Sequence, residues 1–223
     1  MILKTYEDMV IELMQQPKYP AEIVALALDL TIHSHEEHTP AKFTSSLGKY
    51  LIEAEHTSPL EHVHYTFLIQ GVSRSFLAQI TRHRMGSFTS ASQHYQDYSE
   101  YPCIVDKANR FITDVLKMSY KGYEVLLNQE LLPREEARQV LPNASAVNLL
   151  WSVNARGLIT FLKQRLCYRN VKEMQIFAER VLLLVKPTFP EIFNHIGPQC
   201  FMDKCKQGKL KCTEGPWKKS ITE

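Results

Sequence analysis

Hydrophobic positions recur at helical spacing over most of this chain and alternate at strand spacing in two places. The helical spacing covers residues 5–16, 21–31, 105–130, 154–166 and 170–185, and a short helical stretch ends near Leu141. Residues 63–71 and 144–153 are rich in β-branched and aromatic side chains and predict strands. Thr39 and Pro40 have the form of an N-cap and a first helical residue, which predicts a helix running to about Glu55. We expect one α+β domain over residues 1–196, a mixed or antiparallel sheet flanked by helices, and a Lys- and Cys-rich tail over 197–223.

A further predicted helix carries Phe76, Leu77 and Ile80 and continues into the motif Arg82-His83-Arg84. Its apolar face would lead on to Arg84, so charge is expected where packing would otherwise occur, and a buried charge requires an anionic partner. Three serine hydroxyls follow the motif, on Ser87, Ser90 and Ser92. Guanidinium and hydroxyl groups together suit phosphate oxygens. Taken alone, the motif is also compatible with a solvated basic turn, which is the commoner case.

Residues 85–104 lack periodicity and hold many Ser, Thr, Gln, His and Tyr side chains. This composition predicts a long loop of the kind that often carries function.

The composition is that of an ordinary water-soluble globular protein. The 223 residues are 44% hydrophobic and 22% charged, and the formal net charge of +2 gives no overall basic field that would indicate nucleic-acid binding. Met1 is followed by no apolar leader, and no stretch is long and apolar enough to span a membrane. The five cysteines are an odd number, so we expect free thiols in a reducing, cytoplasmic compartment.

Two groups of residues could bind metal. Cys200, Cys205 and Cys212 stand close together in the tail, and His195 comes shortly before them. A small zinc site is one interpretation, but reduced cysteines are favoured because no Cys-x-x-Cys pair is present. The histidines of residues 33–38 adjoin two glutamates and lack regular spacing, so a solvated loop is favoured there.

Other arginines stand in partly apolar settings. Arg165 shares a helical face with Leu158 and Phe161, which indicates either an ion pair, with Glu173 or another acid, or contact with a ligand. Arg138 has a similar setting, and Arg156 lies near a helix start, where exposed backbone N–H groups favour anions. Together these arginines indicate a pocket for a small molecule with several negative charges.

Familiar catalytic patterns are absent from the sequence. It contains no Gly-x-Gly-x-x-Gly or Gly-Lys-Ser/Thr loop and no Gly-x-Ser-x-Gly elbow. A cysteine beside a clear histidine partner is also lacking. If the protein is an enzyme, we therefore expect a cofactor to carry its chemistry.

Four blocks in order resemble the flavin-dependent thymidylate synthases. Arg82-His83-Arg84, followed by seven residues and Ser92, matches the signature of that family. The other three blocks are Glu55–His62, Ala137–Pro142, and the helix that begins with Asn154-Ala155-Arg156 and includes Arg165. The resemblance covers residues 45–195 and implies the fold of the thymidylate synthase complementing proteins.

The resemblance implies an enzyme that makes dTMP from dUMP with FAD, NADPH and methylenetetrahydrofolate, and a homotetramer whose active sites are shared between subunits. It implies contact to FAD by Ser58, Arg82, His83, Arg84, Ser90, Asn154, Arg156 and Thr160. It implies contact to the nucleotide by Gln79, Arg82, Ser90, Ala91, Ser92, Gln93, His94, Arg138 and Arg165. Arg165 matches the activating arginine of the family and would be the catalytic residue. Its permanent charge would stabilise negative charge on the uracil and raise the electron density at C5.

The chain departs from the family in the loop Ser90–His94, where members carry an acid, an amide and an arginine. His94 takes the place of that arginine and weakens the expected grip on phosphate, because histidine is only partly charged near neutral pH. Arg169, which replaces a histidine of many members, is a candidate for the missing charge.

Two alternatives follow from these departures. One is a relative that alkylates C5 of another pyrimidine nucleotide, such as UMP. The other is a non-catalytic protein that binds nucleotides or nucleic acid, for which the basic tail gives some support.

Overall fold

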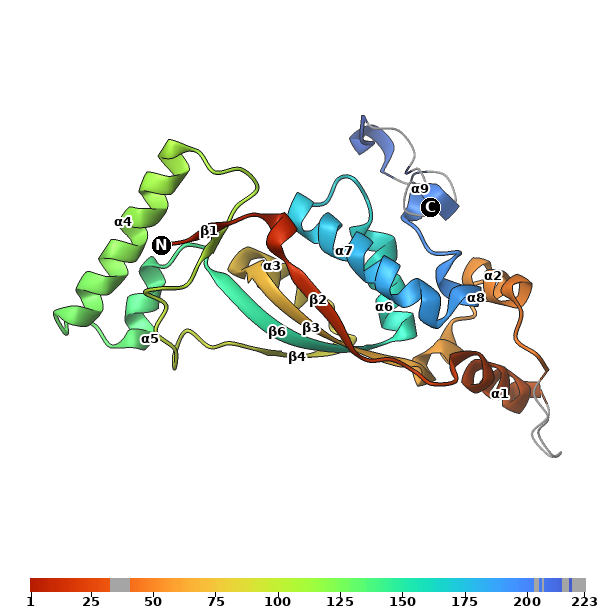
Figure 1. Cartoon of the computed structure of the whole chain (residues 1–223). Helices are drawn as coiled ribbons and strands as arrows, with labels where there is room; N and C mark the ends of the chain where they lie inside the picture. The colour runs from red at the N-terminus through yellow and green to blue at the C-terminus, as the bar shows by residue number, and fades with distance from the viewer. Residues whose placement is uncertain (33–40, 203–204, 206, 214–216, 218–223) are drawn as a thin grey trace. The chain divides into compact units, whose positions relative to one another are not determined.

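The computed structural model describes residues 1–32, 41–202, 205, 207–213 and 217 (Figure 1). The chain divides into two compact units. The first consists of Met1–Glu12, Leu68–Arg84 and Phe88–Trp151. The second consists of Leu13–Phe67, Met85–Ser87 and Ser152–Glu223.

Two sheets are formed by strands β1 (Leu3–Lys4), β2 (Val10–Gln15), β3 (His64–Ser73), β4 (Gly86–Ser90), β5 (Cys103–Ile104) and β6 (Ala146–Asn154). The larger sheet has the order β2-β3-β6-β4, and β1 pairs with β5 in parallel (Figure 1). An antiparallel bridge joins Cys103 to Ser145. Strands β2, β3, β4 and β6 each contribute residues to both units. The mixture of parallel and antiparallel pairing, together with the helices, confirms the expected α+β class.

The first unit contains helices α3 (Arg74–Ile80), α4 (Arg110–Asn128) and α5 (Arg134–Ala137) and the 3₁₀ turns η1 (Tyr6–Asp8) and η3 (Arg138–Val140). Helix α4 begins after Asn109, whose side chain accepts a hydrogen bond from the Ile112 N–H at 2.9 Å. The helix buries Leu116, Tyr120 and Tyr123 on one face and packs against α5 and η3. This packing fixes the short α5–η3 segment.

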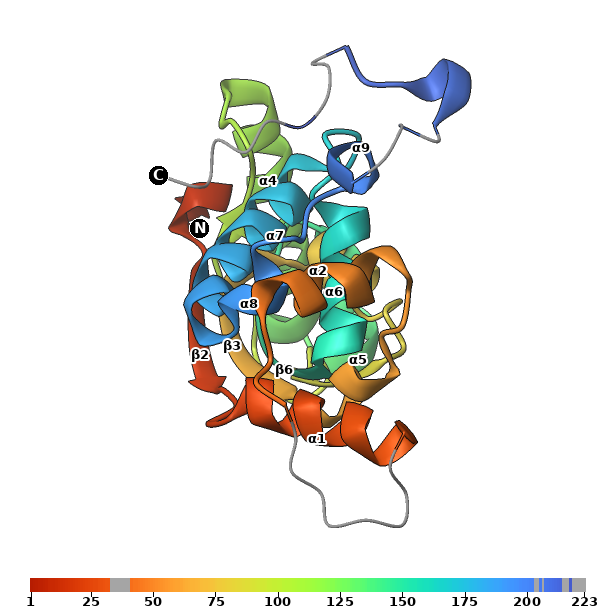
Figure 2. The same ribbon diagram turned by 90° about the vertical axis from the view of Figure 1, so that its right-hand side faces the viewer.

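The second unit contains helices α1 (Pro20–Ile32), α2 (Ser45–Glu53), α6 (Ala155–Arg165), α7 (Lys172–Val185), α8 (Pro190–Phe193) and α9 (Gln199–Met202). Its 3₁₀ turns are η2 (Ser58–His62), η4 (Lys186–Thr188) and η5 (Gly208–Leu210). Helices α6 and α7 pack together through Phe161 and Phe177, whose rings meet edge to face at 5.7 Å. Helix α2 lies against α8 (Figure 2), and a Cβ at Gly48 would collide with the Glu191 carbonyl oxygen, so only glycine fits there.

The predictions for residues 21–31, 63–71, 105–130, 144–153, 154–166 and 170–185 are confirmed in type, with boundaries that shift by a few residues. The helix predicted over residues 5–16 is wrong, because this segment forms η1 and the strand β2. β2 is an edge strand of the larger sheet and leaves most of its side chains partly or fully exposed. Its pairing in the sheet therefore decides its conformation, rather than a periodic apolar face of its own.

The helix predicted to begin at Thr39–Pro40 begins later, at Ser45, and Thr39 and Pro40 lie outside the described residues, as do His33, His35 and His38. Thr44 is the true N-cap, and its hydroxyl accepts a hydrogen bond from the Leu47 N–H at 3.3 Å.

The helix predicted to carry Arg84 ends earlier, at Ile80. Thr81 is its C-cap, and the Thr81 hydroxyl donates to the Leu77 carbonyl at 2.8 Å. The Arg-His-Arg motif therefore follows the helix instead of continuing its buried face. Arg82 and Arg84 are exposed, so the expectation of buried charge was wrong.

The segment 85–104, predicted as a loop, contains the strand β4 at its start and the short strand β5 at its end. Between them the chain has turns and bends, as predicted. Among the described residues, no helix is long and apolar enough to cross a membrane.

Candidate active site

The first turn of α6 gathers several predicted cofactor contacts in the second unit. Asn154 is its N-cap, and the Asn154 Oδ1 accepts a hydrogen bond from the Gly157 N–H at 2.8 Å. Arg156 is exposed and its guanidinium pairs with the Glu61 carboxylate. The Thr160 hydroxyl, one turn later, donates to the Arg156 carbonyl at 3.1 Å. This turn therefore presents an anchored arginine beside the positive end of a helix dipole.

The turn η2 supplies Glu61 and places Ser58 in the same region. Ser58 is exposed and begins η2, which packs against α6. The Ala155 N–H also donates to the Val63 carbonyl at 2.7 Å, directly after η2. The block Glu55–His62 and the Asn154–Arg156 block, separate in sequence, are thus brought together. Glu61 lies in the first block, but no spacing or motif in the sequence predicts its pairing with Arg156.

Gly157 allows a third segment to approach the same turn. A Cβ at this position would lie 3.1 Å from the Met85 carbonyl oxygen and 3.0 Å from the Val153 Cγ2. Met85 therefore lies close against the first turn of α6. Met85 follows Arg84 in the chain, so the Arg-His-Arg motif ends one residue before this contact.

Arg165 lies at the other end of α6 and is half-buried. Its Nη1 donates to the Asn170 Oδ1 at 3.1 Å. The Asn170 Nδ2 in turn donates to the carbonyl oxygens of Gln164, at 2.7 Å, and Cys167, at 3.1 Å. Asn170 thus ties the guanidinium of Arg165 to the turn between α6 and α7 through a neutral amide. Asn170 is not among the site residues expected from the sequence, which gave no sign of this contact to Arg165.

The predicted nucleotide contacts of the first unit lie mostly on its surface. Gln79 is half-buried near the end of α3, and the exposed Ser90 ends β4. The Ala91 N–H donates to the Asn148 carbonyl at 3.3 Å, and the Ser92 hydroxyl accepts from the His94 N–H at 3.2 Å. Gln93 is the buried member of this loop.

Glu135 of α5 joins two of these predicted contacts. The His94 Nδ1 lies 3.3 Å from the Glu135 carboxylate, and the Arg138 Nε donates to the Glu135 carbonyl at 2.9 Å. The Arg134 guanidinium also donates to the Tyr95 carbonyl at 2.9 Å, which ties the same helix to the loop. Glu135 was not predicted. It contacts Arg138 through its backbone carbonyl, which any residue type could supply, and its carboxylate comes near His94 only in the folded chain.

Three comparisons relate the chain to known proteins. The sequence model of the family described as thymidylate synthase complementing protein (Thy1) matches residues 12–191. A flavin-dependent thymidylate synthase of Geobacter sulfurreducens is 33% identical over 219 residues, which cover 92% of this chain and 94% of that protein.

Two solved structures share the fold. The UMP/dUMP methylase PolB from Streptomyces cacaoi, bound with 5-Br dUMP, has a TM-score of 0.74 at 23% identity and covers 87% of this chain and 96% of that one. Thymidylate Synthase X from Helicobacter pylori, with FAD and dUMP, has a TM-score of 0.70 at 23% identity and covers 83% of this chain and 97% of that one. At such identities the likeness establishes the fold alone, which is the fold expected from the sequence.

Proposed function

The chain belongs to the family of the flavin-dependent thymidylate synthases, also described as thymidylate synthase complementing proteins, and from this premise we propose how its residues carry out the reaction. The enzyme methylates dUMP reductively to dTMP, with FAD as its flavin. NADPH is the reductant and methylenetetrahydrofolate the carbon donor. Arginine activates the uracil, and the protein supplies no nucleophile.

The observation that carries the proposal is the arrangement of α6. Arg156 lies on its first turn and pairs with Glu61. Arg165 lies on its last turn and donates a hydrogen bond to Asn170. Nine residues separate the two arginines, which corresponds to about 14 Å along a helix. One packed helix therefore fixes the distance between a cofactor contact and the group that acts on the nucleotide.

The residues around the first turn of α6 fit a flavin dinucleotide. Ser58 offers a hydroxyl donor and Arg156 offers its remaining guanidinium N–H donors beside a helix N-terminus, groups that pyrophosphate oxygens accept from. The exposed Thr160 oxygen, whose proton goes to the Arg156 carbonyl, can accept from a ribose hydroxyl. Asn154 caps α6, the helix that carries Arg156 and Thr160. Gly157, which has no Cβ, lets the Met85 backbone lie close to the first turn of this helix. We assign the same purpose to four residues of the first unit, Arg82, His83, Arg84 and Ser90. When bound, FAD supplies the hydride that reduces the transferred carbon.

Arg165 acts on the pyrimidine. A guanidinium at the N3 and O4 edge stabilises the negative charge that develops there, which increases the electron density at C5. Arginine suits this role because it stays protonated. Asn170 keeps the guanidinium oriented, because its Oδ1 accepts a hydrogen bond from the Arg165 Nη1.

The rest of the nucleotide is assigned to the first unit, with Gln79, the loop Ser90–His94 and Arg138 as its contacts. Glu135 orders two of them, because it contacts both His94 and Arg138. Arg169 is better assigned elsewhere than to the phosphate, since its Nη1 donates to the Gln207 Oε1 of the tail at 2.6 Å.

We also propose that the enzyme is a homotetramer with shared active sites and works in the cytoplasm. The family resemblance supports both, and the exposure of Arg82, Arg84 and Arg156 on the single chain supports the sharing. UMP methylation has less support than dUMP methylation. Its argument is the structural likeness to PolB at 23% identity, whereas curated thymidylate synthases reach 33% over nearly the whole chain.

The proposal is tested by an anaerobic absorption experiment on purified protein reconstituted with FAD. NADPH is added with dUMP, with UMP or with no nucleotide, and methylenetetrahydrofolate then completes the reaction. We expect flavin bleaching that is faster with dUMP, followed by formation of dTMP. Product from UMP alone would favour the second candidate, and protein that fails to bind flavin would contradict both.

A further inference from the structure

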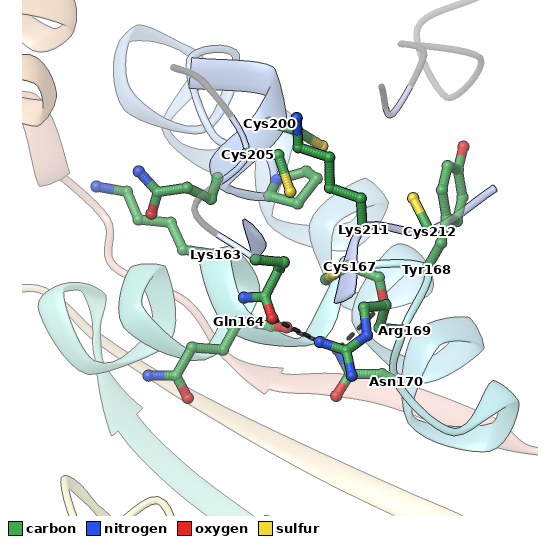
Figure 3. A pocket seen from close by; sticks show the side chains of 13 residues that line it. Lys163, Gln164, Cys167, Tyr168, Arg169, Asn170, Cys200, Cys205, Lys211 and Cys212 are labelled. Carbon is green, nitrogen blue, oxygen red and sulfur yellow. Dashed lines mark hydrogen bonds between the residues drawn. The ribbon is translucent and has the colours of Figure 1, made fainter. Parts of the chain in front are cut away.

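Four of the five cysteines line one cavity of the second unit. The cavity has a volume of about 670 Å³ and lies between the end of α6 with the turn that follows it and the C-terminal tail (Figure 3). Cys167 comes from the turn, and Cys200, Cys205 and Cys212 come from the tail. All four are partly exposed, whereas Cys103 is fully buried. Thiols from two segments that are distant in sequence therefore line one accessible cavity, which core packing does not explain.

Three cationic side chains line the same cavity. They are Lys163 of α6, Arg169 of the turn and Lys211 of the tail. Among the described residues that line the cavity, none carries a carboxylate. Burial lowers the pKa of Lys163, and the nearby Glu55 carboxylate partly offsets this effect. The surface around the thiols is thus electropositive and suits a ligand with negative charge.

Within the residues that are described, no group of three or more His, Cys, Asp or Glu side chains is placed to hold a metal ion. His195, which the sequence suggested as a fourth ligand, instead has its Nε2 2.9 Å from the Ser45 hydroxyl. The thiols share a cavity without converging on a point.

We propose that this cavity is a site of thiol–disulfide exchange with small anionic disulfides, such as the oxidised form of an acidic peptide thiol. A cavity sulfur, as its thiolate, attacks one sulfur of the disulfide. The disulfide bond breaks as the new mixed disulfide forms, and the released thiolate takes up the proton that the protein thiol has lost. Lys163, Arg169 and Lys211 attract the anionic disulfide and stabilise the negative charge shared by the reacting sulfurs.

Exchange at Cys167 has a consequence for the proposed function, and this part rests on that function. The Cys167 carbonyl accepts a hydrogen bond from the same Asn170 amide whose oxygen holds Arg165. A bulky group on Cys167 would displace this turn. The orientation of Arg165 would then change, and dUMP turnover would fall.

The test compares three disulfides on the full-length protein after removal of reductant. Oxidised glutathione is anionic, 2-hydroxyethyl disulfide is neutral and cystamine is cationic. Intact mass and peptide mapping give the rate of modification at each cysteine. Each rate is divided by the rate at which the same disulfide reacts with a small free thiol, which corrects for its intrinsic reactivity. At the cavity cysteines we expect oxidised glutathione to be favoured about tenfold over cystamine, and less so at high salt.

Matched variants show which cationic side chains cause the preference for oxidised glutathione. Arg169→Gln and Lys211→Gln should each reduce it several-fold, while Lys209→Gln, at an exposed position that does not line the cavity, should leave it unchanged. Equal normalised rates for the three disulfides would overturn the proposal, as would modification of the buried Cys103 at the rate of the cavity thiols. One zinc ion per chain in purified protein, with unreactive cavity thiols, would also overturn it. None of these readouts depends on thymidylate synthesis, so the two proposals can fail separately.

Discussion

The two regions that supply the proposed nucleotide contacts are built differently. Arg165 is carried by α6, a helix whose Leu158, Phe161 and Leu162 are buried in the core. His94 and Arg138 lie on exposed segments, and Glu135 on a four-residue helix contacts both of them. A packed helix fixes a group to within a fraction of an ångström, whereas surface segments adapt. With the proposed roles, the chain therefore holds its activating group rigidly and leaves its contacts to the nucleotide adjustable.

Replacing one arginine in each region gives the largest expected effects. Arg165→Gln should lower kcat about 100-fold or more, because a preorganised charge at the developing anion is lost. Arg138→Gln should raise the KM for dUMP up to about tenfold and change kcat little, because binding alone is affected. Steady-state kinetics with dUMP as the varied substrate separate the two. Equal losses of kcat in both variants would erase the distinction between the regions.

The rigidity of α6 is tested next by a pair of glycine substitutions. Gly157→Ala places a Cβ against the Met85 carbonyl and Val153, and should destabilise the protein by about 1 to 2 kcal/mol. Gly122→Ala in α4 has open space around its Cβ and should stabilise by about 0.5 to 1 kcal/mol. Chemical denaturation measures both. If the two variants shift stability in the same direction, the close contact at Gly157 is not as tight as described.

Replacing Asn170, which accepts a hydrogen bond from Arg165, should have a smaller effect on kcat than replacing Arg165 itself. Asn170→Ala deletes the hydrogen bond from the Arg165 guanidinium together with the two that the Asn170 amide donates to the Gln164 and Cys167 carbonyls. Loss of the bond to the charged group, about 1.5 kcal/mol, corresponds to about tenfold in kcat. FAD binding, measured by fluorescence quenching, should stay unchanged because the proposed cofactor contacts on α6 lie at its other end. Asn194→Ala, at an exposed asparagine after α8, serves as the matched control. A large change in the KM for dUMP at unchanged kcat would indicate that Asn170 binds nucleotide directly.

The smallest effect is expected in the adaptable region. Glu135→Gln removes the carboxylate beside His94 but keeps the backbone carbonyl that accepts from Arg138. Such an exposed pair contributes little, so the KM for dUMP should rise only about two- to threefold. Titration of dUMP binding by calorimetry checks this. A loss as large as that of Arg165→Gln would show that the loop is also a fixed part of the site.

Much of the rigid region could be predicted from sequence, and less of the adaptable one. Helix α6 has both its capping residue, Asn154, and a buried stripe of its own, so its type and start are readable. The strand β2 forms because it pairs with β3, and α3 ends at its C-cap Thr81. Neither contact is visible in the hydrophobic periodicity of the sequence. The expectation that Arg84 lies on the buried face failed because it assumed that the helix continued beyond Ile80.

The positioning residues were hidden for a related reason. Asn170 acts through two backbone carbonyls and one guanidinium, and Glu135 acts partly through its own backbone carbonyl. Neither residue belongs to a motif with a characteristic spacing. Only the folded turns bring their partners within reach, so sequence reasoning located the arginines but not what orients them.

The central claim, that Arg165 activates C5 of the uracil rather than merely binding the nucleotide, is tested most directly by tritium release from dUMP labelled at C5. The complete reaction is run at saturating nucleotide with the native enzyme and with Arg165→Gln. We predict that the native enzyme releases tritium in step with dTMP, and that the variant, with dUMP still bound, releases it at least about 100-fold more slowly. Release at the native rate from the saturated variant would contradict the claim and reduce Arg165 to a binding residue.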